Sequence, residues 1–416
     1  MAPVSPITRI KAYMIVAVIV CMLLGLFFSR ALLTGGTIFL FLLSFINTDF
    51  VVTRRKYTIN YNILLSLLFL IPLISGLWSN NLSEWWQRCG IKLPFLLLPF
   101  AFSALGLLRK ENYLLLSVLF IGLVMAGTFW SFIEYLHHTS SIQTGYLKST
   151  LLEVWLHNDH VLFSWSAVIA IILIIIQTMG KRPISKIRML FSWVVIGWLV
   201  FFLHLLAART GLLCLYIIAL IWGIYKLKQK SFKAGIAILF FIIVLPLISF
   251  LLIPTYHNRV LYVVYDLQQY FKGNFPPGFS DVSRIISYEG GFNITRNHFF
   301  TGVGFGDVAD SMNHWYEIKY SYLTEHDRIL PHNEGLMFSC GAGIFALLIF
   351  TYIVLYPFFM KPNWEWIAFH LTALICFFTD ATLETQNGVF LYCFFIFWMK
   401  IGINYKYGIA FGSDNY

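Results

Sequence analysis

The sequence is poor in charged and polar residues. Charged residues make up 12% of the 416 positions and hydrophobic residues 59%, whereas a soluble globular protein carries about 25% charged and about 45–50% apolar residues. The mean hydropathy is +0.76. Such a chain cannot cover a globule in water with polar side chains. The composition therefore excludes a set of soluble domains and predicts a protein that crosses a membrane several times.

The sequence also lacks the cysteine patterns of cross-linked or zinc-binding proteins. None of the six cysteines forms a CxxC pair, and no HExxH motif occurs, so we expect neither a disulfide framework nor a metal site. The net charge of +10 would suit a nucleic-acid partner, but basic residues in short cytoplasmic loops explain it more simply. We therefore expect no nucleic-acid partner. The cysteines are Cys21, Cys89, Cys214, Cys340, Cys376 and Cys393.

What the chain does have is a series of apolar stretches that suit helices crossing a hydrocarbon layer of about 30 Å. They predict an all-α polytopic membrane protein with about twelve transmembrane helices. We interpret the first stretch as a retained span, because it is long for a signal peptide and no small-residue cleavage site follows it. The predicted spans are Tyr13–Ser29, Ala31–Ile46, Ile59–Trp78, Ile91–Leu108, Tyr113–Tyr135, His160–Thr178, Leu190–Ala207, Gly211–Tyr225, Ala234–Ile253, Glu334–Tyr356, Ile367–Asp380 and Val389–Ile401.

Basic clusters occupy every second gap between these spans, which predicts that those gaps and both termini are cytoplasmic. The chain then divides into residues 1–253 with spans one to nine, a long extracytoplasmic region at 254–332, and residues 333–416 with spans ten to twelve. The clusters are Arg9/Lys11, Arg54/Arg55/Lys56, Arg109/Lys110, Lys181/Arg182/Lys186/Arg188 and Lys226/Lys228/Lys230/Lys233.

The 254–332 segment is much longer than the structureless loops of about 12–15 residues that compact proteins tolerate. It is also rich in aromatic residues, which argues against disorder. We predict two short helices, one from Asn258 or Arg259 to Tyr270 and one from Ser280 or Asp281 to the Gly290-Gly291 pair. The segment is either an ordered cap over the helix bundle or the roof of an active site outside the cytoplasm.

Two arginines stand out as candidate anion ligands. Arg209 lies between two predicted spans with almost no loop, where a charge is costly unless it is paired, reaches the interface or binds a ligand. A snorkelling anchor is the simpler interpretation, whereas a planar guanidinium would also bind phosphate oxygens bidentately. Arg284 lies in the second predicted loop helix and would by itself be an ordinary solvated arginine.

Polar residues also gather where the chain re-enters the membrane. His332 would act as a base near neutral pH or donate hydrogen bonds to a phosphate, or it belongs with Asn333 to a helix-capping cluster. Glu384 and Gln386 lie between the last two predicted spans. They are either helix caps or part of the same cavity.

A glycine-rich stretch follows His298, with Gly302, Gly304 and Gly306 at a spacing of two. It is unlike a nucleotide-binding loop, because no P-loop lysine follows it and no strand of a βαβ unit precedes it. A tight turn in which the backbone approaches another backbone or a ligand is the better interpretation.

Taken in order, these motifs resemble the superfamily of O-antigen ligases and polymerases, which are bacterial envelope glycosyltransferases, and the ligases most closely. With the predicted spans, the resemblance covers the whole chain. The motifs that carry it are Ala208-Arg209-Thr210-Gly211, Ser283-Arg284-Ile285, residues 298–306, His332-Asn333 with Gly341 and Gly343, and residues 377–388.

The resemblance implies a GT-C-like glycosyltransferase of the bacterial inner membrane that works without metal or cofactor. It would transfer a glycan, with inversion, from undecaprenyl pyrophosphate to an acceptor hydroxyl on the periplasmic side. The favoured reaction is ligation of O-antigen to lipid A–core in lipopolysaccharide biosynthesis. Arg209 and Arg284 would bind the pyrophosphate and His332 would take the acceptor's proton. Candidate supporting residues are Asn333, His298, Gly304, Glu384 and Gln386.

Three other functions stay open at this stage. An O-antigen polymerase or a protein O-oligosaccharyltransferase would share the donor and differ in the acceptor. A transporter of lipid-linked glycans would carry polar residues through the middle of several spans, whereas here they gather at outer helix ends and in one long loop. That distribution favours an enzyme. The length of about 400 residues and the single long loop favour a ligase, and the sequence does not specify the sugar.

Overall fold

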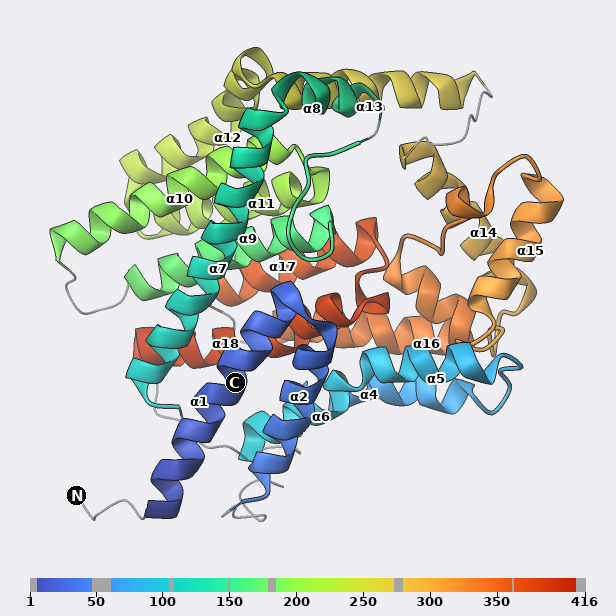
Figure 1. The fold of residues 1–416 in the computed structure, drawn as a ribbon, viewed down its shortest axis with the longest axis horizontal. Coiled ribbons are helices and arrows are strands. Elements are labelled where there is room, and N and C mark those ends of the chain that lie inside the picture. The colour runs from blue at the N-terminus through green and yellow to red at the C-terminus, as the bar shows by residue number, and fades with distance from the viewer. Residues whose placement is uncertain are drawn as a thin grey trace.

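The computed structural model of the chain is a bundle of helices (Figure 1). The structure describes residues 6–46, 61–104, 108–148, 150–178, 185–272, 280–360 and 363–408, and these residues contain helices and no strand. The predicted all-α class is confirmed. The basic residues Arg54, Arg55, Lys56, Lys181 and Arg182 of the predicted cytoplasmic clusters lie outside the described residues.

Each predicted span coincides with a helix. Within the described ranges, eight helices are long and apolar enough to cross a membrane, and three further apolar helices have 15 or 16 residues. The chain is therefore a multi-pass membrane protein, and the number twelve stays a prediction. The helices that coincide with the predicted spans, which also include the 11-residue α6, are α1 (Pro6–Phe28), α2 (Arg30–Ser44), α4 (Tyr61–Ser75), α6 (Pro94–Ala104), α7 (Lys110–His137), α9 (His160–Thr178), α10 (Lys186–Leu206), α11 (Arg209–Lys228), α12 (Phe232–Leu252), α16 (Glu334–Phe359), α17 (Trp364–Thr379) and α18 (Gln386–Tyr407).

Helices α9 and α18 form the centre of the bundle. Side chains are buried on all sides of both helices, and α9 contacts α7, α10, α11, α17 and α18. Helix α12 is equally apolar, but most of its large side chains are exposed, including Phe240 and Leu251. A helix that is apolar all round is either buried in a core or surrounded by lipid. We therefore interpret α12 as a peripheral helix that faces the membrane.

The described part of the 254–332 segment contains three helices, α13 (Pro254–Phe271), α14 (Ser280–Asn297) and α15 (Val308–Lys319), and a short 3₁₀ turn at Glu325–Asp327. Helix α13 lies beside α8 (Thr139–Gly145) at the top of Figure 1, and α14 and α15 lie at the right. The first predicted helix is present and begins four residues earlier than expected, with a proline in its first turn. Proline suits that position because the first-turn N–H groups have no helical partner.

The prediction that Gly290-Gly291 ends the second loop helix is wrong, because α14 continues to Asn297. A methyl group on Gly290 would come within 2.8 Å of Met312 of α15, and one on Gly291 within 3.2 Å of Pro331. These glycines allow neighbouring segments to pack against the helix. Helix α15, which was not predicted, buries Val308, Met312, Trp315 and Tyr316 along one face.

A second element that the sequence analysis missed is α5 (Leu82–Lys92), which lies in a gap predicted as loop. The side chain of Asn81 caps it by accepting a hydrogen bond from the N–H of Glu84 at 3.1 Å. Such a cap satisfies one of the free amides of the first turn. Helix α5 contributes two cations, Arg88 and Lys92, to the bundle interior.

The basic residues at the start of α10 and the end of α11 predict the orientation in the membrane. Single cysteines would test it. If those ends are cytoplasmic, the exposed Asn313 of α15 is outside. We expect Asn313→Cys to react with a membrane-impermeant maleimide in cells with a permeabilised outer membrane. Background labelling should be low, because five of the six native cysteines are buried.

The control is Ser231→Cys in the turn between α11 and α12, where the native residue is exposed. We expect it to react only after the inner membrane is opened. The reverse pattern of labelling would show that the orientation is inverted.

Candidate functional site

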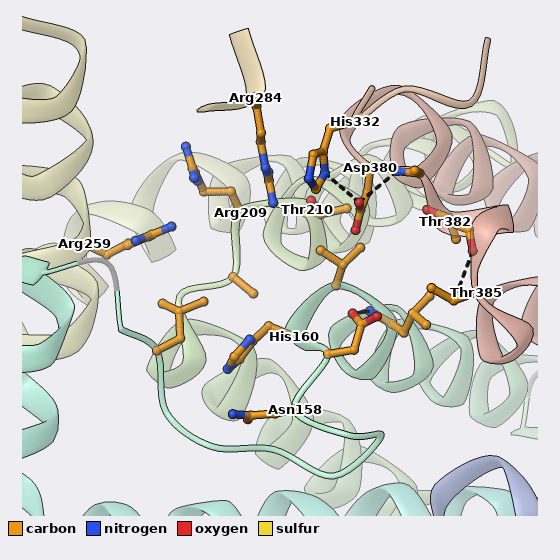
Figure 2. Close-up of a pocket in the computed structure, with 16 residues that line it drawn as sticks. Asn158, His160, Arg209, Thr210, Arg259, Arg284, His332, Asp380, Thr382 and Thr385 are labelled. Atoms are coloured by element: carbon orange, nitrogen blue, oxygen red, sulfur yellow. Dashed lines mark hydrogen bonds and ion pairs between the residues drawn. The ribbon is translucent and has the colours of Figure 1, made fainter. Parts of the chain in front are cut away.

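The three residues predicted to carry the chemistry, Arg209, Arg284 and His332, line one cavity of about 360 Å³ (Figure 2). This volume is at the lower end of the range of about 300–1,000 Å³ for ligand pockets. The other lining residues come from the segment before α9 and its first turn, from the start of α11, from α13 and from the α17–α18 connection: Leu151, Asn158, Asp159, His160, Val161, Leu162, Ala208, Thr210, Arg259, Asp380, Ala381, Thr382 and Thr385.

Arg209 is the first residue of α11 and follows a connection of two residues from α10. The hydroxyl of the next residue, Thr210, lies 3.1 Å from that of Thr379 at the end of α17. A methyl group on Gly211 would come within 2.3 Å of Ser164, so glycine lets α11 approach α9 closely. The Arg-Thr-Gly sequence thus joins three helices and places the guanidinium at the cavity.

Arg284 lies on α14, which also holds the backbone of His332. The hydroxyl of Ser287 donates to the carbonyl of Arg284 at 2.7 Å and accepts from the N–H of His332 at 3.2 Å. A third arginine, Arg259 of α13, also lines the cavity and is only 7% exposed. Figure 2 shows Arg209, Arg259 and Arg284 on one side of the cavity. Arg259 was predicted to lie in a loop helix, but it was not predicted as a site residue.

His332 is paired with a carboxylate that the sequence analysis did not single out. Its Nδ1 lies 2.8 Å from Oδ1 of Asp380, the residue after α17. Burial raises the pKa of Asp380, but the hydrogen bond and charge of His332, with Arg284, hold it below its usual value. Because an ionised carboxylate only accepts, we assign the proton to Nδ1. Nε2 is then the nitrogen that can exchange a proton with a bound group.

Asn333 serves the backbone around this histidine. Its side chain accepts from the N–H of Leu336 at 3.0 Å as the cap of α16, and it donates to the carbonyl of Phe378 at 3.3 Å. It does not line the cavity. Its two hydrogen bonds fix the start of α16 against the end of α17, and the partner of the His332 ring is Asp380.

His298 and Gly304 lie outside the cavity lining. Gly304 has a φ of +94°, and a methyl group on it would come within 2.3 Å of Ser79. The N–H groups of Val303 and Gly304 donate to the carbonyls of Cys340 and Gly341 at 2.8 and 3.0 Å. The glycine-rich stretch is therefore a tight turn that packs against the backbone of α16, in agreement with the interpretation from the sequence.

Glu384 and Gln386 also lie outside the cavity lining. Glu384 is buried and pairs with Nζ of Lys92 at 2.5 Å and with Nη1 of Arg88 at 2.9 Å. Burial raises the pKa of Glu384, but the two cations outweigh this effect and lower it. Gln386 donates a hydrogen bond to the hydroxyl of Thr34 in α2. Both side chains hold the α17–α18 connection in place.

A second carboxyl group, that of Asp159, lines the cavity at the start of α9. Its Oδ1 accepts from the N–H of Leu162 at 2.9 Å. Burial and the neighbouring Asp380 raise the pKa of Asp159 to about 7. The three residues before it, Leu156, His157 and Asn158, all have positive φ, at 65°, 56° and 64°. Asp159 could not be singled out from the sequence, because an isolated carboxylate in a loop is an ordinary feature.

Comparison with known families finds one match. Residues 194–351 match the family model described as O-antigen ligase, and the match contains Arg209, Arg259, Arg284 and His332. These residues belong to the O-antigen ligase family. The match confirms the resemblance to the O-antigen ligase superfamily over this region and supports a function of the ligase or polymerase type, and the apolar helices make the chain a multi-pass membrane protein. A search of curated proteins finds none that matches the chain.

The ion pairs of Glu384 predict a large effect of one substitution on stability. Lys92→Met should leave a buried carboxylate with one partner fewer, and breaking a buried pair typically costs about 3–5 kcal/mol. The free energy of unfolding of the purified protein in detergent would measure it. The control is Lys319→Met, which removes an exposed pair with Glu289 at 2.7 Å and should cost at most about 1 kcal/mol. Equal, small effects would contradict a structural role for the Glu384 pairs.

Proposed function

We propose that the protein transfers a glycan from undecaprenyl pyrophosphate to an acceptor hydroxyl at the periplasmic face of the inner membrane. The favoured reaction is ligation of O-antigen to lipid A–core, with inversion and without a metal ion. The observation that carries the proposal is that three arginines and a paired histidine share one cavity, whose arginines and histidine all belong to the ligase-family region.

The donor's pyrophosphate would be bound by Arg209, Arg259 and Arg284. Guanidinium groups bind phosphate oxygens through two parallel hydrogen bonds. Their positive charge also opposes the negative charge that develops on the leaving pyrophosphate, which is the usual way in which a preorganised site accelerates such a step. Since Arg209 begins a membrane helix, the lipid tail of the donor would lie against the neighbouring helices of the bundle.

His332 would act as the general base. Its Nε2 would take the proton of the acceptor hydroxyl while that oxygen forms a bond to the anomeric carbon of the glycan. The bond from this carbon to the pyrophosphate breaks, and its electron pair leaves with the pyrophosphate. Asp380 would hold the ring through Nδ1 and stabilise the imidazolium that forms. A single displacement of this kind inverts the anomeric configuration.

The acceptor separates this proposal from its alternatives, and deletion of the gene followed by gel analysis of lipopolysaccharide tests it. For a ligase we expect the loss of all capped bands together with accumulation of lipid-linked polymer. Core that carries a single repeat unit would indicate an O-antigen polymerase instead. Unchanged lipopolysaccharide with loss of glycoproteins would indicate a protein O-oligosaccharyltransferase.

The division of roles in the site predicts different defects for different variants. Arg209→Lys and Arg284→Lys keep the charge and lose the bidentate geometry, so we expect weaker donor binding and turnover lowered by about 10²–10³-fold. His332→Ala should bind the donor normally and lose about 10²–10⁴-fold in turnover. Donor binding and turnover would be measured on each purified variant.

A matched control is Arg296→Lys, because Arg296 lies on the same helix as Arg284 and is exposed away from the cavity lining. We expect both measurements to equal those of the wild type. Normal turnover of His332→Ala would refute its role as a base. Loss of donor binding in that variant would instead assign His332 to the pyrophosphate site.

A further inference from the structure

We propose that Asp159 and Thr382 form the acceptor subsite of the cavity and bind hydroxyl groups of an unphosphorylated sugar. This inference rests on the proposed function, because it concerns the second substrate of the same transfer. Neither residue was predicted from the sequence, and Thr382 lies outside the ligase-family match at 194–351.

The geometry of the transfer decides on which side the acceptor lies. In an inverting displacement, the acceptor oxygen approaches the anomeric carbon from the side opposite the leaving pyrophosphate. In Figure 2 the three arginines lie at the left, Thr382 and Thr385 at the right, and His332 and Asp380 between them. A donor whose pyrophosphate is bound by the arginines therefore presents its anomeric carbon toward His332. The acceptor would then bind on the side of the cavity where Thr382 lies.

Thr382 carries a hydroxyl that the protein itself does not satisfy. The residue lines the cavity and is 2% exposed, and its buried Oγ1 makes no hydrogen bond to any described residue. Most buried side-chain polar atoms have a partner, so each exception calls for an explanation. The position of Thr382 is fixed, since its carbonyl accepts from the hydroxyl of Thr385 at 3.1 Å. A hydroxyl group of the acceptor sugar would supply the missing partner.

Asp159 adds a carboxyl group to the same cavity. One of its oxygens accepts from the N–H of Leu162, and a carboxylate offers about four acceptor positions in total. Capacity therefore remains for sugar hydroxyls, which donate hydrogen bonds. Asp159 and Asp380 together place two carboxyl groups on the lining of the cavity. These groups would repel a phosphate on the acceptor. The subsite therefore selects a neutral sugar at the point of attachment.

The test separates this role from a structural one through two conservative variants. Asp159→Asn keeps the cap of α9, because asparagine caps helices as well as aspartate does. Thr382→Val removes the hydroxyl and keeps the shape. With undecaprenyl-pyrophosphate glycan and lipid A–core as substrates, we expect each to raise the KM for the acceptor by about 5–10-fold, as the loss of one or two hydrogen bonds would. The KM for the donor should stay unchanged, and Thr382→Ser should restore the acceptor KM.

Stability provides the second measurement. Replacing an unpartnered buried hydroxyl by a methyl group should leave the melting temperature of Thr382→Val unchanged or raise it. The control is Thr37→Val, because Thr37 is also buried and its hydroxyl donates to a carbonyl of its own helix, α2. We expect this control to leave both KM values unchanged.

The outcomes distinguish the two proposals. Absence of transfer by the wild-type protein would refute the proposed function itself. A wild type that transfers, with variants that keep the acceptor KM, would refute the subsite alone. A lower melting temperature for Thr382→Val without a change in KM would show that the hydroxyl is structural. A rise in the donor KM would place these residues in the donor site, and either result would overturn the inference.

Discussion

The buried carboxylate of Glu384 is the constraint on which the geometry of the site depends. It must be paired, because an unpaired charge in a protein interior costs several kcal/mol. Its partners Lys92 and Arg88 lie on α5, nearly 300 residues earlier in the chain. The short 3₁₀ turn Thr382–Glu384 is therefore held against α5. Since Asp380 lies two residues before this turn and Thr385 directly after it, the same ion pairs fix one wall of the cavity.

A second requirement, that the ends of helices find hydrogen-bond partners, positions Arg284 and His332. The last carbonyls of a helix have no partner within it, and the carbonyl of Phe378 at the end of α17 accepts from Tyr288 at 3.0 Å and from Asn333 at 3.3 Å. These bonds hold α14 and the start of α16 against the end of α17. Helix α14 carries Arg284, and His332 lies just before α16. The positive ends of α9, α11, α16 and α18 also converge near the cavity, and helix N-termini favour an anion.

Much of this arrangement could be predicted from the sequence because the membrane penalises polar groups. Each predicted apolar span coincides with a helix, and His160–Thr178 matches α9 at both ends. Arg209 and His332 were conspicuous because a polar residue next to a membrane span needs a reason. The same argument gave no information about Arg259 and Asp159, which lie in segments where polar residues are ordinary.

The predictions that failed have a different cause. Close packing between distant segments leaves no local pattern in the sequence. Gly290-Gly291 looks like the end of a helix in the sequence, and only the positions of Met312 and Pro331 reveal its role. In the same way, nothing near Glu384 in the sequence indicates Lys92 as its partner. Pairing across the bundle depends on the final arrangement of α5 and the α17–α18 connection, and hydropathy carries no information about it.

The charges of the cavity also explain how the proposed site would accelerate the transfer. The cavity lining carries three guanidinium groups and two carboxyl groups. Asp380 is ionised, whereas the pKa of Asp159, about 7, leaves its carboxyl only partly charged near neutral pH. The excess of positive charge lies on the arginine side (Figure 2). When the bond to the glycan breaks, the pyrophosphate gains negative charge and the arginines attract it more strongly than they attracted the intact donor. An interaction that strengthens between the ground state and the transition state is the kind that raises the rate, so the same three side chains would bind the donor and lower the barrier.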